Sequence, residues 1–192
     1  RAKGKKGHAV FLDCKSAYDT VPEYALSVAF GRLGASKKFT KWATATVGNH
    51  HRVTQVRSGM SSYDSRFKTG GLAQDSPESP LFWTVVADLV LSYAAKTGGK
   101  GYQLIDRLSE EDPEEVRVQQ LAFADDFACF DETKEGVQRT AQAVVTILGV
   151  FNIRVSPEKC VYLWSKAAHD EVLTPKNTLA GLCITRPRTQ AT

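Results

Sequence analysis

Two adjacent carboxylates, Asp125 and Asp126, follow Phe123 and Ala124 in the second half of the chain. The segment 116–131 reads as a strand, a tight turn and a second strand, so both side chains should project from a hairpin tip. Like charges placed so close together repel one another unless a cation neutralises them. Hard divalent ions such as Mg²⁺ take carboxylate oxygens and substrate phosphates as ligands. Because an Asp-Asp pair is also common in ordinary turns, its surroundings must decide between the two interpretations.

A phosphoryl-transfer site of this kind needs a third carboxylate from another strand. Two divalent ions about 3.5–4 Å apart could then clamp the attacking and leaving oxygens of an in-line displacement. Asp13 is the obvious candidate, because it ends the apolar run His8 to Leu12, which predicts a buried strand. A single aspartate at a strand end is usually only a turn or cap residue, so this position does not establish the site by itself.

Four segments of the chain resemble the palm motifs of reverse transcriptases, in the order in which that family carries them. They are Phe11–Asp19, Gly71–Phe82, Phe123–Asp126, and Gly149–Asn152 followed by Lys159 and Cys160. The spacing is most similar to that of the non-LTR retrotransposon (LINE-type) branch. The resemblance implies an α+β polymerase palm, an antiparallel sheet with helices packed on one face, together with part of the fingers. It also implies an RNA-directed DNA polymerase, which transfers a nucleotide from a dNTP to a primer 3′-OH.

The resemblance assigns the metal site to Asp13, Asp125 and Asp126, assisted by the backbone carbonyl of Cys14. These groups would hold two Mg²⁺ ions, with Mn²⁺ as an alternative. Lys159 stands where the family places a general acid that protonates the leaving pyrophosphate. Outside such a motif, a lysine is ordinarily a solvated surface residue.

Tyr18 follows Asp13 at the position of an aromatic gate in the family. A flat ring beneath the sugar C2′ would exclude a 2′-hydroxyl and so select deoxynucleotides. Without the motif, Tyr18 would be interpreted as a half-buried core residue. Gln74 would line the nucleotide pocket beside the template. Ser79 and Pro80 would begin the helix that supports this pocket, or would act only as helix caps.

Asp75 departs from the family pattern, which usually has glycine at this position of the nucleotide pocket. Glycine allows the backbone to pass close to the nucleotide. An aspartate adds a Cβ and a negative charge beside a triphosphate, and repulsion across roughly 4–6 Å would cost on the order of 1–4 kcal/mol. We therefore expect weaker nucleotide binding, a slower reaction, or a copy that has lost catalysis.

Two alternative functions remain open. Asp75 and the acidic loop 109–115 suggest a non-catalytic, domesticated palm-like module that binds RNA or protein. The further alternative is the palm of an RNA-directed RNA polymerase, which should prefer ribonucleotides and usually has glycine where this chain has Ala124. Tyr18 and Ala124 argue against that alternative. Loss of catalysis usually removes at least one metal carboxylate, whereas all three are present here.

The chain has 25 Lys and Arg against 21 Asp and Glu, a formal net charge of +4. Four of the basic residues lie within residues 1–7, which contain no acid, so the rest of the chain is neutral overall. The resemblance implies an RNA template, a DNA primer and dNTP as partners. Arg52, Arg57, Arg66 and Lys68 form the best local cluster for a template strand. The alternative for this cluster is an ordinary solvated hairpin face.

The residue pattern also predicts the elements that must position these motifs. We expect helices from Thr20 to about Gly34, from Ser36 to Gly48, over 77–95, and from Asp131 or Thr133 to Gly149. A hairpin is expected at 51–57 and 62–68, short strands at 160–164 and 178–184, and a flexible break at 98–101. This order fits an antiparallel sheet with helices on one side.

Several classes of protein are excluded. The longest apolar stretch, 81–95, is too short for a membrane span and contains Asp88, and no signal peptide is visible. The four cysteines have neither metal-ligand nor redox-motif spacing. Scattered free thiols are typical of a reducing compartment, so we expect an intracellular protein, nuclear or cytoplasmic, with no membrane partner.

The chain is expected to be a piece of a longer polymerase. Residues 1–7 would be a basic tail, residues 8–176 the palm with partial fingers at about 34–70, and residues 177–192 the end leading towards a missing thumb. The upstream fingers would precede Arg1 and the thumb would follow Thr192. Because much of the positive charge that grips nucleic acid would lie in these missing segments, the piece alone should be inactive or weak.

Overall fold

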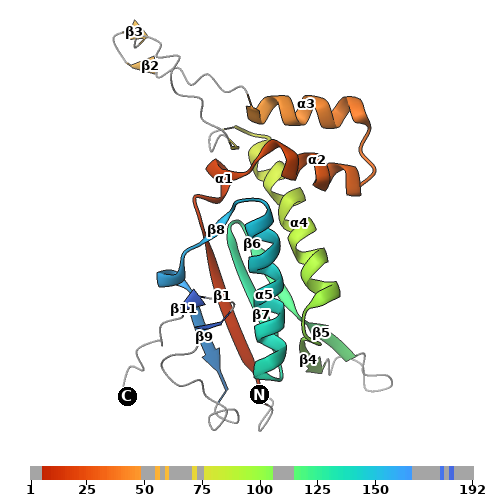
Figure 1. Cartoon of the computed structure of the whole chain (residues 1–192), viewed down its shortest axis with the longest axis vertical. Helices are drawn as coiled ribbons and strands as arrows, with labels where there is room; N and C mark the ends of the chain where they lie inside the picture. The colour runs from red at the N-terminus through yellow and green to blue at the C-terminus, as the bar shows by residue number, and fades with distance from the viewer. Residues whose placement is uncertain are drawn as a thin grey trace. The chain divides into compact units, whose positions relative to one another are not determined.

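The structure is a computed structural model of the chain (Figure 1). It describes residues 6–48, 55–56, 59–60, 71–72, 76–105, 115–165, 178–179 and 182–183. The helices are α1 Ala17–Thr20, α2 Glu23–Arg32, α3 Lys37–Gly48, α4 Ser79–Thr97 and α5 Lys134–Val150, with a 3₁₀ turn, η1, at Pro157–Lys159. The strands are β1 His8–Lys15, β2 Gln55–Val56, β3 Gly59–Met60, β4 Tyr102–Ile105, β5 Glu115–Val118, β6 Gln120–Phe123, β7 Asp126–Asp131, β8 Arg154–Val155, β9 Val161–Trp164, β10 Thr178–Leu179 and β11 Leu182–Cys183.

The chain divides into two compact units. The first, called the sheet unit below, comprises residues 1–15, 90–150 and 154–192. The second, called the helical unit below, comprises residues 16–89 and 151–153. The proposed metal carboxylates all belong to the sheet unit, whereas Tyr18 belongs to the helical unit.

Strand β1 is the centre of the sheet unit. It lies in an antiparallel sheet with the strand order β6-β7-β1-β8, and β9 also pairs with β1. In the register of β1 and β7, His8 lies opposite Asp131 and Asp13 lies opposite Asp126. Strand β9 pairs with the first half of β1, and β8 pairs with its last two residues. The apolar run predicted as a buried strand is therefore confirmed as the middle of a sheet.

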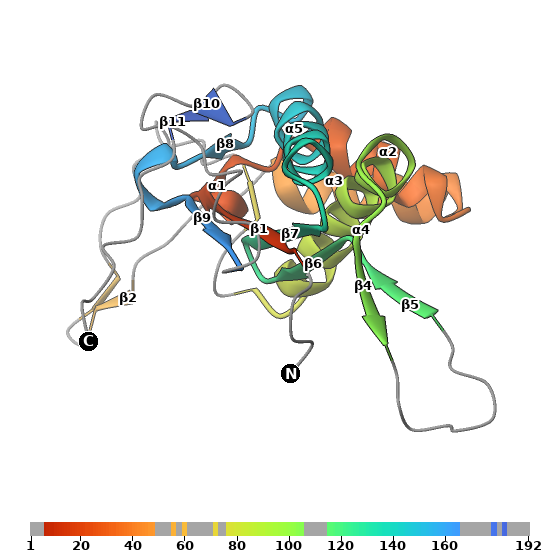
Figure 2. The ribbon, with the colours of Figure 1, turned by 90° about the horizontal axis from the view of Figure 1, so that it is seen from below.

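Helix α5 covers one face of this sheet (Figure 2). Along β1, the side chains of Val10, Leu12 and Cys14 are buried, whereas Phe11 between them is exposed. This period of two is expected for a strand with one covered face. The buried apolar side chains of α5 include Val137, Ala141, Val144 and Leu148. Burying a large apolar side chain contributes about 1.5–3 kcal/mol. The predicted α+β architecture, with helix packing on one face of an antiparallel sheet, is confirmed.

The helical unit is held together by aromatic contacts among α2, α3 and α4. The ring of Phe30 on α2 meets Phe39 on α3 at 5.2 Å and Phe82 on α4 at 5.5 Å, both edge to face. Such pairs contribute about 0.5–1.5 kcal/mol beyond their buried area. Arg32 and Asp88 add an ion pair within this unit. The aspartate that interrupts the apolar pattern of α4 therefore has a structural partner.

The ends of α2 and α3 largely follow the predicted signals. Gly34 lies just beyond α2 with a φ of +76°, a conformation that glycine adopts without strain. The N–H of Phe39 donates to Ser36 Oγ at 3.2 Å, so Ser36 caps α3 as predicted. The prediction for Thr20 was wrong. Thr20 ends the short helix α1, and its hydroxyl donates to the Ser16 carbonyl, while Pro22 precedes α2 as its N-cap residue.

Gly98, Gly99 and Gly101 are tightly packed in the connection between α4 and β4. This segment is therefore not the flexible break expected from the sequence. A Cβ on Gly98 would lie 2.7 Å from the Ala94 carbonyl oxygen, and a Cβ on Gly99 would collide with the carboxylate of Asp131. The N–H of Gly101 donates to Asp131 Oδ2 at 2.9 Å. These glycines are therefore needed for close approach to a buried carboxylate.

Other boundaries differ from the prediction. Gly149 does not end α5, which continues to Val150, and Asn152 adopts the left-handed conformation with a φ of +56°. Strands β2 and β3 pair with Val56 opposite Gly59, before the predicted second strand 62–68, which lies outside the described residues. The segment 178–184 contains two paired strands instead of one. Among the described residues, no helix is long and apolar enough to cross a bilayer.

Candidate active site

Two of the three predicted metal carboxylates face each other across neighbouring strands. Asp13 on β1 lies directly opposite Asp126 on β7, and side chains of directly opposite residues project from the same face of a sheet. Asp125 precedes Asp126 in the turn between β6 and β7. The N–H of Cys14 donates to the Asp125 carbonyl at 3.3 Å, which fastens this turn to the end of β1.

The turn that presents the aspartates is locally strained. Phe123 pairs with Asp126, so only Ala124 and Asp125 connect β6 to β7. Two-residue hairpin turns require a positive φ at their first central residue, where glycine or asparagine is preferred. Ala124 takes this place with a φ of +51°, at a cost of about 1–2 kcal/mol relative to a right-handed conformation. The antiparallel strands on either side hold the turn in this geometry.

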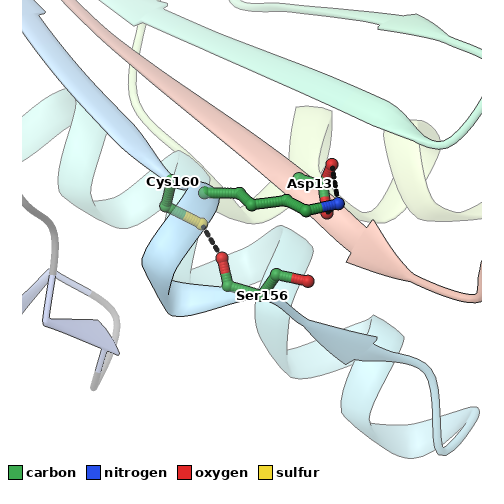
Figure 3. A network of polar contacts seen from close by, with 4 residues as sticks. Asp13, Ser156 and Cys160 are labelled. Atoms are coloured by element: carbon green, nitrogen blue, oxygen red, sulfur yellow. Dashed lines mark hydrogen bonds and ion pairs between the residues drawn. The ribbon is translucent and has the colours of Figure 1, made fainter.

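Lys159 belongs to the 3₁₀ turn η1 and contacts Asp13, which is labelled in Figure 3 together with Ser156. The N–H of Ser156 donates to the Asp13 carbonyl at 2.8 Å, and the N–H of Lys159 donates to the Ser156 carbonyl at 3.1 Å. These bonds anchor η1 beside the end of β1. The ammonium of Lys159 then lies 3.2 Å from each of the two carboxylate oxygens of Asp13. The structure therefore joins two residues predicted from distant motifs.

The electrostatics of these groups reflect a concentration of negative charge. Burial raises the pKa of Asp126, and the neighbouring charges of Asp125 and Asp13 raise it further, while Lys159 acts in the opposite direction. The hydrogen bond to Asp13 and its charge raise the pKa of Lys159. An additional cation near these carboxylates is therefore favourable.

The donor chemistry at this hairpin suits a hard divalent ion. Oδ2 of Asp13 is buried and accepts no hydrogen bond in the described part of the chain, although it lies within ion-pair distance of Lys159. Carboxylate oxygens are the ligands that Mg²⁺ prefers. Nevertheless, no three His, Cys, Asp or Glu residues among those described are gathered closely enough to hold a metal ion as they stand. Without a cation between them, like-charged carboxylates repel, and Lys159 already pairs with Asp13.

Cys14 presents its backbone, and not its thiol, to this region. Its side chain is buried on the sheet face opposite to that of Asp13. Burial raises the pKa of the thiol to about 12, and the nearby aspartates act in the same direction. The thiol is therefore protonated at neutral pH and is no candidate metal ligand. The predicted role of the Cys14 carbonyl as a metal ligand stays a prediction.

The ring of Tyr18 packs against an aromatic partner, Trp83, that was not predicted from the sequence. Its ring stacks on Trp83 of α4, with centroids 5.6 Å apart and planes inclined by 30°. Trp83 is buried, with 2% of its surface exposed, whereas Tyr18 is half-buried. The signal that could have found Trp83 is its position one turn after Ser79 and Pro80, which begin α4 as predicted.

The first two motif segments meet within the helical unit. The N–H of Leu72 donates to the Tyr18 carbonyl at 2.7 Å. Gly71 has a φ of +92°, and a Cβ at this position would collide with the backbone of Asp19. Glycine is therefore required where the second motif passes the first.

Several predicted site residues lie outside the described residues. They are Gln74 and Asp75 of the nucleotide pocket and the template cluster Arg52, Arg57, Arg66 and Lys68. Their predicted roles stay predictions. Of the other site residues, the structure brings together Asp13, Cys14, Asp125, Asp126 and Lys159 in the sheet unit, and it places Tyr18 in the helical unit.

Known proteins resemble this chain in sequence over most of its length. It is 24% identical over 165 residues to the retrovirus-related Pol polyprotein from type-1 retrotransposable element R2 of Popillia japonica, a match that covers 83% of this chain and 25% of that protein. It is 23% identical over 150 residues to the retrovirus-related Pol polyprotein from type-2 retrotransposable element R2DM of Drosophila melanogaster. This match covers 78% of this chain and 13% of that protein. The chain thus spans a quarter or less of the length of these relatives.

A solved structure shares the fold. Telomerase from Candida tropicalis, in complex with a TWJ fragment of telomeric RNA, matches with a TM-score of 0.54 and 14% sequence identity, over 98% of this chain and 31% of that one. This likeness agrees with the polymerase palm predicted from the motifs. A family model described as reverse transcriptase (RNA-dependent DNA polymerase) matches residues 1–173. The chain belongs to the reverse transcriptase family, and its similarity to two R2 elements confirms the predicted retrotransposon branch.

Proposed function

We propose that the chain carries the catalytic palm of an RNA-directed DNA polymerase, which adds nucleotides from dNTPs to a DNA primer on an RNA template. The observation that carries this proposal is the register of β1 and β7. It sets Asp13 opposite Asp126, with Asp125 at the hairpin tip, in a chain that belongs to the reverse transcriptase family. Since the matches cover only 25% and 13% of the two relatives, we propose that fingers and thumb segments of a longer polypeptide complete the enzyme.

Asp13, Asp125 and Asp126 would hold two Mg²⁺ ions, or Mn²⁺ in their place, with help from the Cys14 carbonyl. Bound there, such ions supply electrostatic stabilisation of the attacking and leaving oxygens in phosphoryl transfer. The buried Asp13 Oδ2 that accepts no hydrogen bond supports this assignment, because a metal would satisfy it. The raised pKa of Asp126 supports it as well, since a cation would relieve the repulsion that raises it.

Lys159 would hold a proton on Nζ and donate it to the leaving pyrophosphate. Its contact with Asp13 raises its pKa, which keeps the ammonium protonated at neutral pH. A general acid placed in this way typically contributes about 10²- to 10⁴-fold to a rate. Its position beside Asp13 supports the role implied by the resemblance.

Tyr18 would exclude the 2′-hydroxyl of a ribonucleotide, with Gln74 and Asp75 lining the nucleotide pocket. Stacking on Trp83 would keep the Tyr18 ring in one orientation, as a steric gate requires. Tyr18→Ala should therefore admit ribonucleotides. Unchanged discrimination between rNTP and dNTP in this variant would refute the assignment of the gate.

The proposal is tested by primer extension with the longer parent polypeptide, a primed RNA template, Mg²⁺ and dNTPs. Extension should be lost in Asp125→Asn and retained in Glu135→Gln, which removes an equal charge from the first turn of α5. If the wild-type polypeptide extends no primer with either Mg²⁺ or Mn²⁺, the proposed activity is wrong and the non-catalytic alternative stands. A preference for ribonucleotides would instead support the RNA polymerase alternative.

A further inference from the structure

Helix α3 has an exposed face that is both basic and aromatic. Ala43 and Val47 turn inward and are buried. Lys38, Lys41 and Trp42 are exposed, and their spacing of three and four residues places them on one side of a helix. The solvent side of α3 therefore carries two positive charges next to an indole ring.

The sequence around α3 is positively charged over a long stretch. Residues 24–63 contain no Asp or Glu, and their basic residues are Arg32, Lys37, Lys38, Lys41, Arg52 and Arg57. The neutral total of residues 8–192 conceals this local excess. In the described part of the chain, no carboxylate forms an ion pair with Lys38 or Lys41. Both ammonium groups are thus available to a negatively charged partner.

The ring of Trp42 contacts neighbouring aromatic rings and is also exposed to solvent. Its ring lies 5.5 Å from Phe39 and 6.2 Å from Phe82, the latter contact edge to face. More than half of its surface, 53%, is nevertheless exposed. An indole held by neighbouring rings loses little conformational freedom when a flat group stacks on it. A nucleobase is such a group, since every base offers a π-face.

We propose that the exposed face of α3 binds single-stranded RNA, with Lys38 and Lys41 contacting phosphates and Trp42 stacking on an unpaired base. Charge complementarity selects a polyanion, and the open indole selects one whose bases are unstacked. The inference rests on the proposed function in one respect, the choice of RNA as the strand. All of the residues involved belong to the helical unit, so the surface does not depend on the carboxylates of the sheet unit.

The test is the binding of a fluorescein-labelled 20-nucleotide oligouridine to the 192-residue chain, followed by fluorescence anisotropy over a range of salt concentrations. A single strand contributes a slope of about −0.7 in log K against log[salt] for each phosphate contacted. The double variant Lys38→Gln/Lys41→Gln should therefore bind more weakly, with a slope smaller by about 1.4. The matched control, Lys96→Gln/Lys100→Gln, removes the same charge from exposed positions of the sheet unit and should leave both values unchanged.

The stacking contact is tested separately with Trp42→Leu and Trp42→Phe. The leucine variant should weaken binding about 5- to 150-fold with no change in salt slope, and the phenylalanine variant should lie between it and wild type. Circular dichroism melting checks that each variant remains folded, and the phenylalanine variant preserves packing against Phe82 if leucine does not. Oligouridine supplies unpaired bases throughout, so a duplex RNA of equal length should bind without dependence on Trp42.

Two results would overturn the inference. One is an unchanged affinity and salt slope in the double lysine variant, and the other is an equal dependence of duplex and single-stranded RNA on Trp42. Measured in EDTA, so that no divalent ion at the carboxylates can contact a phosphate, the metal-site variant Asp125→Asn should bind oligouridine as wild type does. Loss of extension in that variant with intact binding would leave the α3 inference standing. If the α3 variants bind oligouridine as wild type does while the parent polypeptide extends primers fully, only the α3 inference is refuted.

Discussion

Asp126→Asn should stabilise the metal-free protein while removing a proposed metal ligand. Burial and the charges of Asp125 and Asp13 raise the pKa of Asp126, and the opposing effect of Lys159 is smaller. The ionised Asp126 is therefore under net repulsion at neutral pH. Replacing it with asparagine retains the shape of the side chain and removes the charge, so the folded state should gain free energy relative to the unfolded chain.

The size of the gain follows from the register. Directly opposite residues in an antiparallel pair have Cβ atoms about 4.5–5.5 Å apart. At about 5 Å, Coulomb's law gives about 0.8 kcal/mol in water and about 3 kcal/mol at an effective dielectric constant of 20. Because Asp126 is exposed to solvent, the lower figure applies, and we expect a gain of about 1 kcal/mol. For a chain of this size that corresponds to about 2–4 °C in melting temperature.

Magnesium should cancel the stability advantage of Asp126→Asn over wild type. If Mg²⁺ binds the folded wild type with a dissociation constant of about 1 mM, then a concentration of about 10 mM stabilises it by about 1.4 kcal/mol. Asp126→Asn lacks one of the proposed ligands and should gain much less. The variant is therefore expected to be the more stable protein in EDTA and to lose this advantage in Mg²⁺.

Urea unfolding monitored by circular dichroism, in EDTA and in Mg²⁺, measures both effects. Glu135→Gln is the matched control, because it removes one negative charge from the first turn of α5, where an acid is favourable. The control should be slightly less stable than wild type and should respond to Mg²⁺ as wild type does. A destabilised Asp126→Asn in EDTA would refute the inferred repulsion. An equal Mg²⁺ response in wild type and Asp126→Asn would refute its role as a ligand.

Three further predictions concern buried groups. Burial raises the pKa of the Cys129 thiol to about 12, so this thiol ionises first in the unfolded chain. Cys129 alone should therefore lower stability by about 2 kcal/mol between pH 9 and 10.5, and urea unfolding of Cys129→Ala should show a fall that is smaller by this amount. Asp131→Ala should cost about 3–5 kcal/mol in the same assay, because it removes the acceptor of three hydrogen bonds. Trp83→Leu should lower the discrimination of the parent polypeptide against ribonucleotides towards that of Tyr18→Ala, whereas Trp83→Phe should preserve it.

The sheet and the carboxylate pair could be predicted because their signals are local. The apolar run that ends at Asp13 has the length of a strand, and the segment around Asp125 has the pattern of a hairpin. The pairing of β1 with β7, by contrast, joins residues more than 100 positions apart. Only the order of the motifs suggested that these strands meet, and their register came from the structure.

The parts that could not be predicted depend on contacts distant in sequence. Gly98 to Gly101 have the composition of a flexible linker, but their conformation is set by the carboxylate of Asp131, which lies 30 residues later. Trp83 has the pattern of an ordinary core residue, and only its stack against Tyr18 connects it to the proposed gate. Gly149 resembles a helix stop, yet the helix ends later, where Asn152 takes the left-handed conformation.

The net charge, taken over the whole of residues 8–192, is a poor guide to where the charged groups of this protein lie. Residues 8–192 are neutral overall, but this balance combines a carboxylate cluster in the sheet unit with an acid-free stretch in the helical unit. The carboxylates repel one another, and a nearby cation reduces this repulsion. The ammonium of Lys159 supplies part of that positive charge. The exposed lysines of α3 can contact a phosphate directly. We therefore expect two kinds of contact with a nucleic acid, one through cations bound at the carboxylates and one through ammonium groups on α3. Neither contact can be inferred from the net charge.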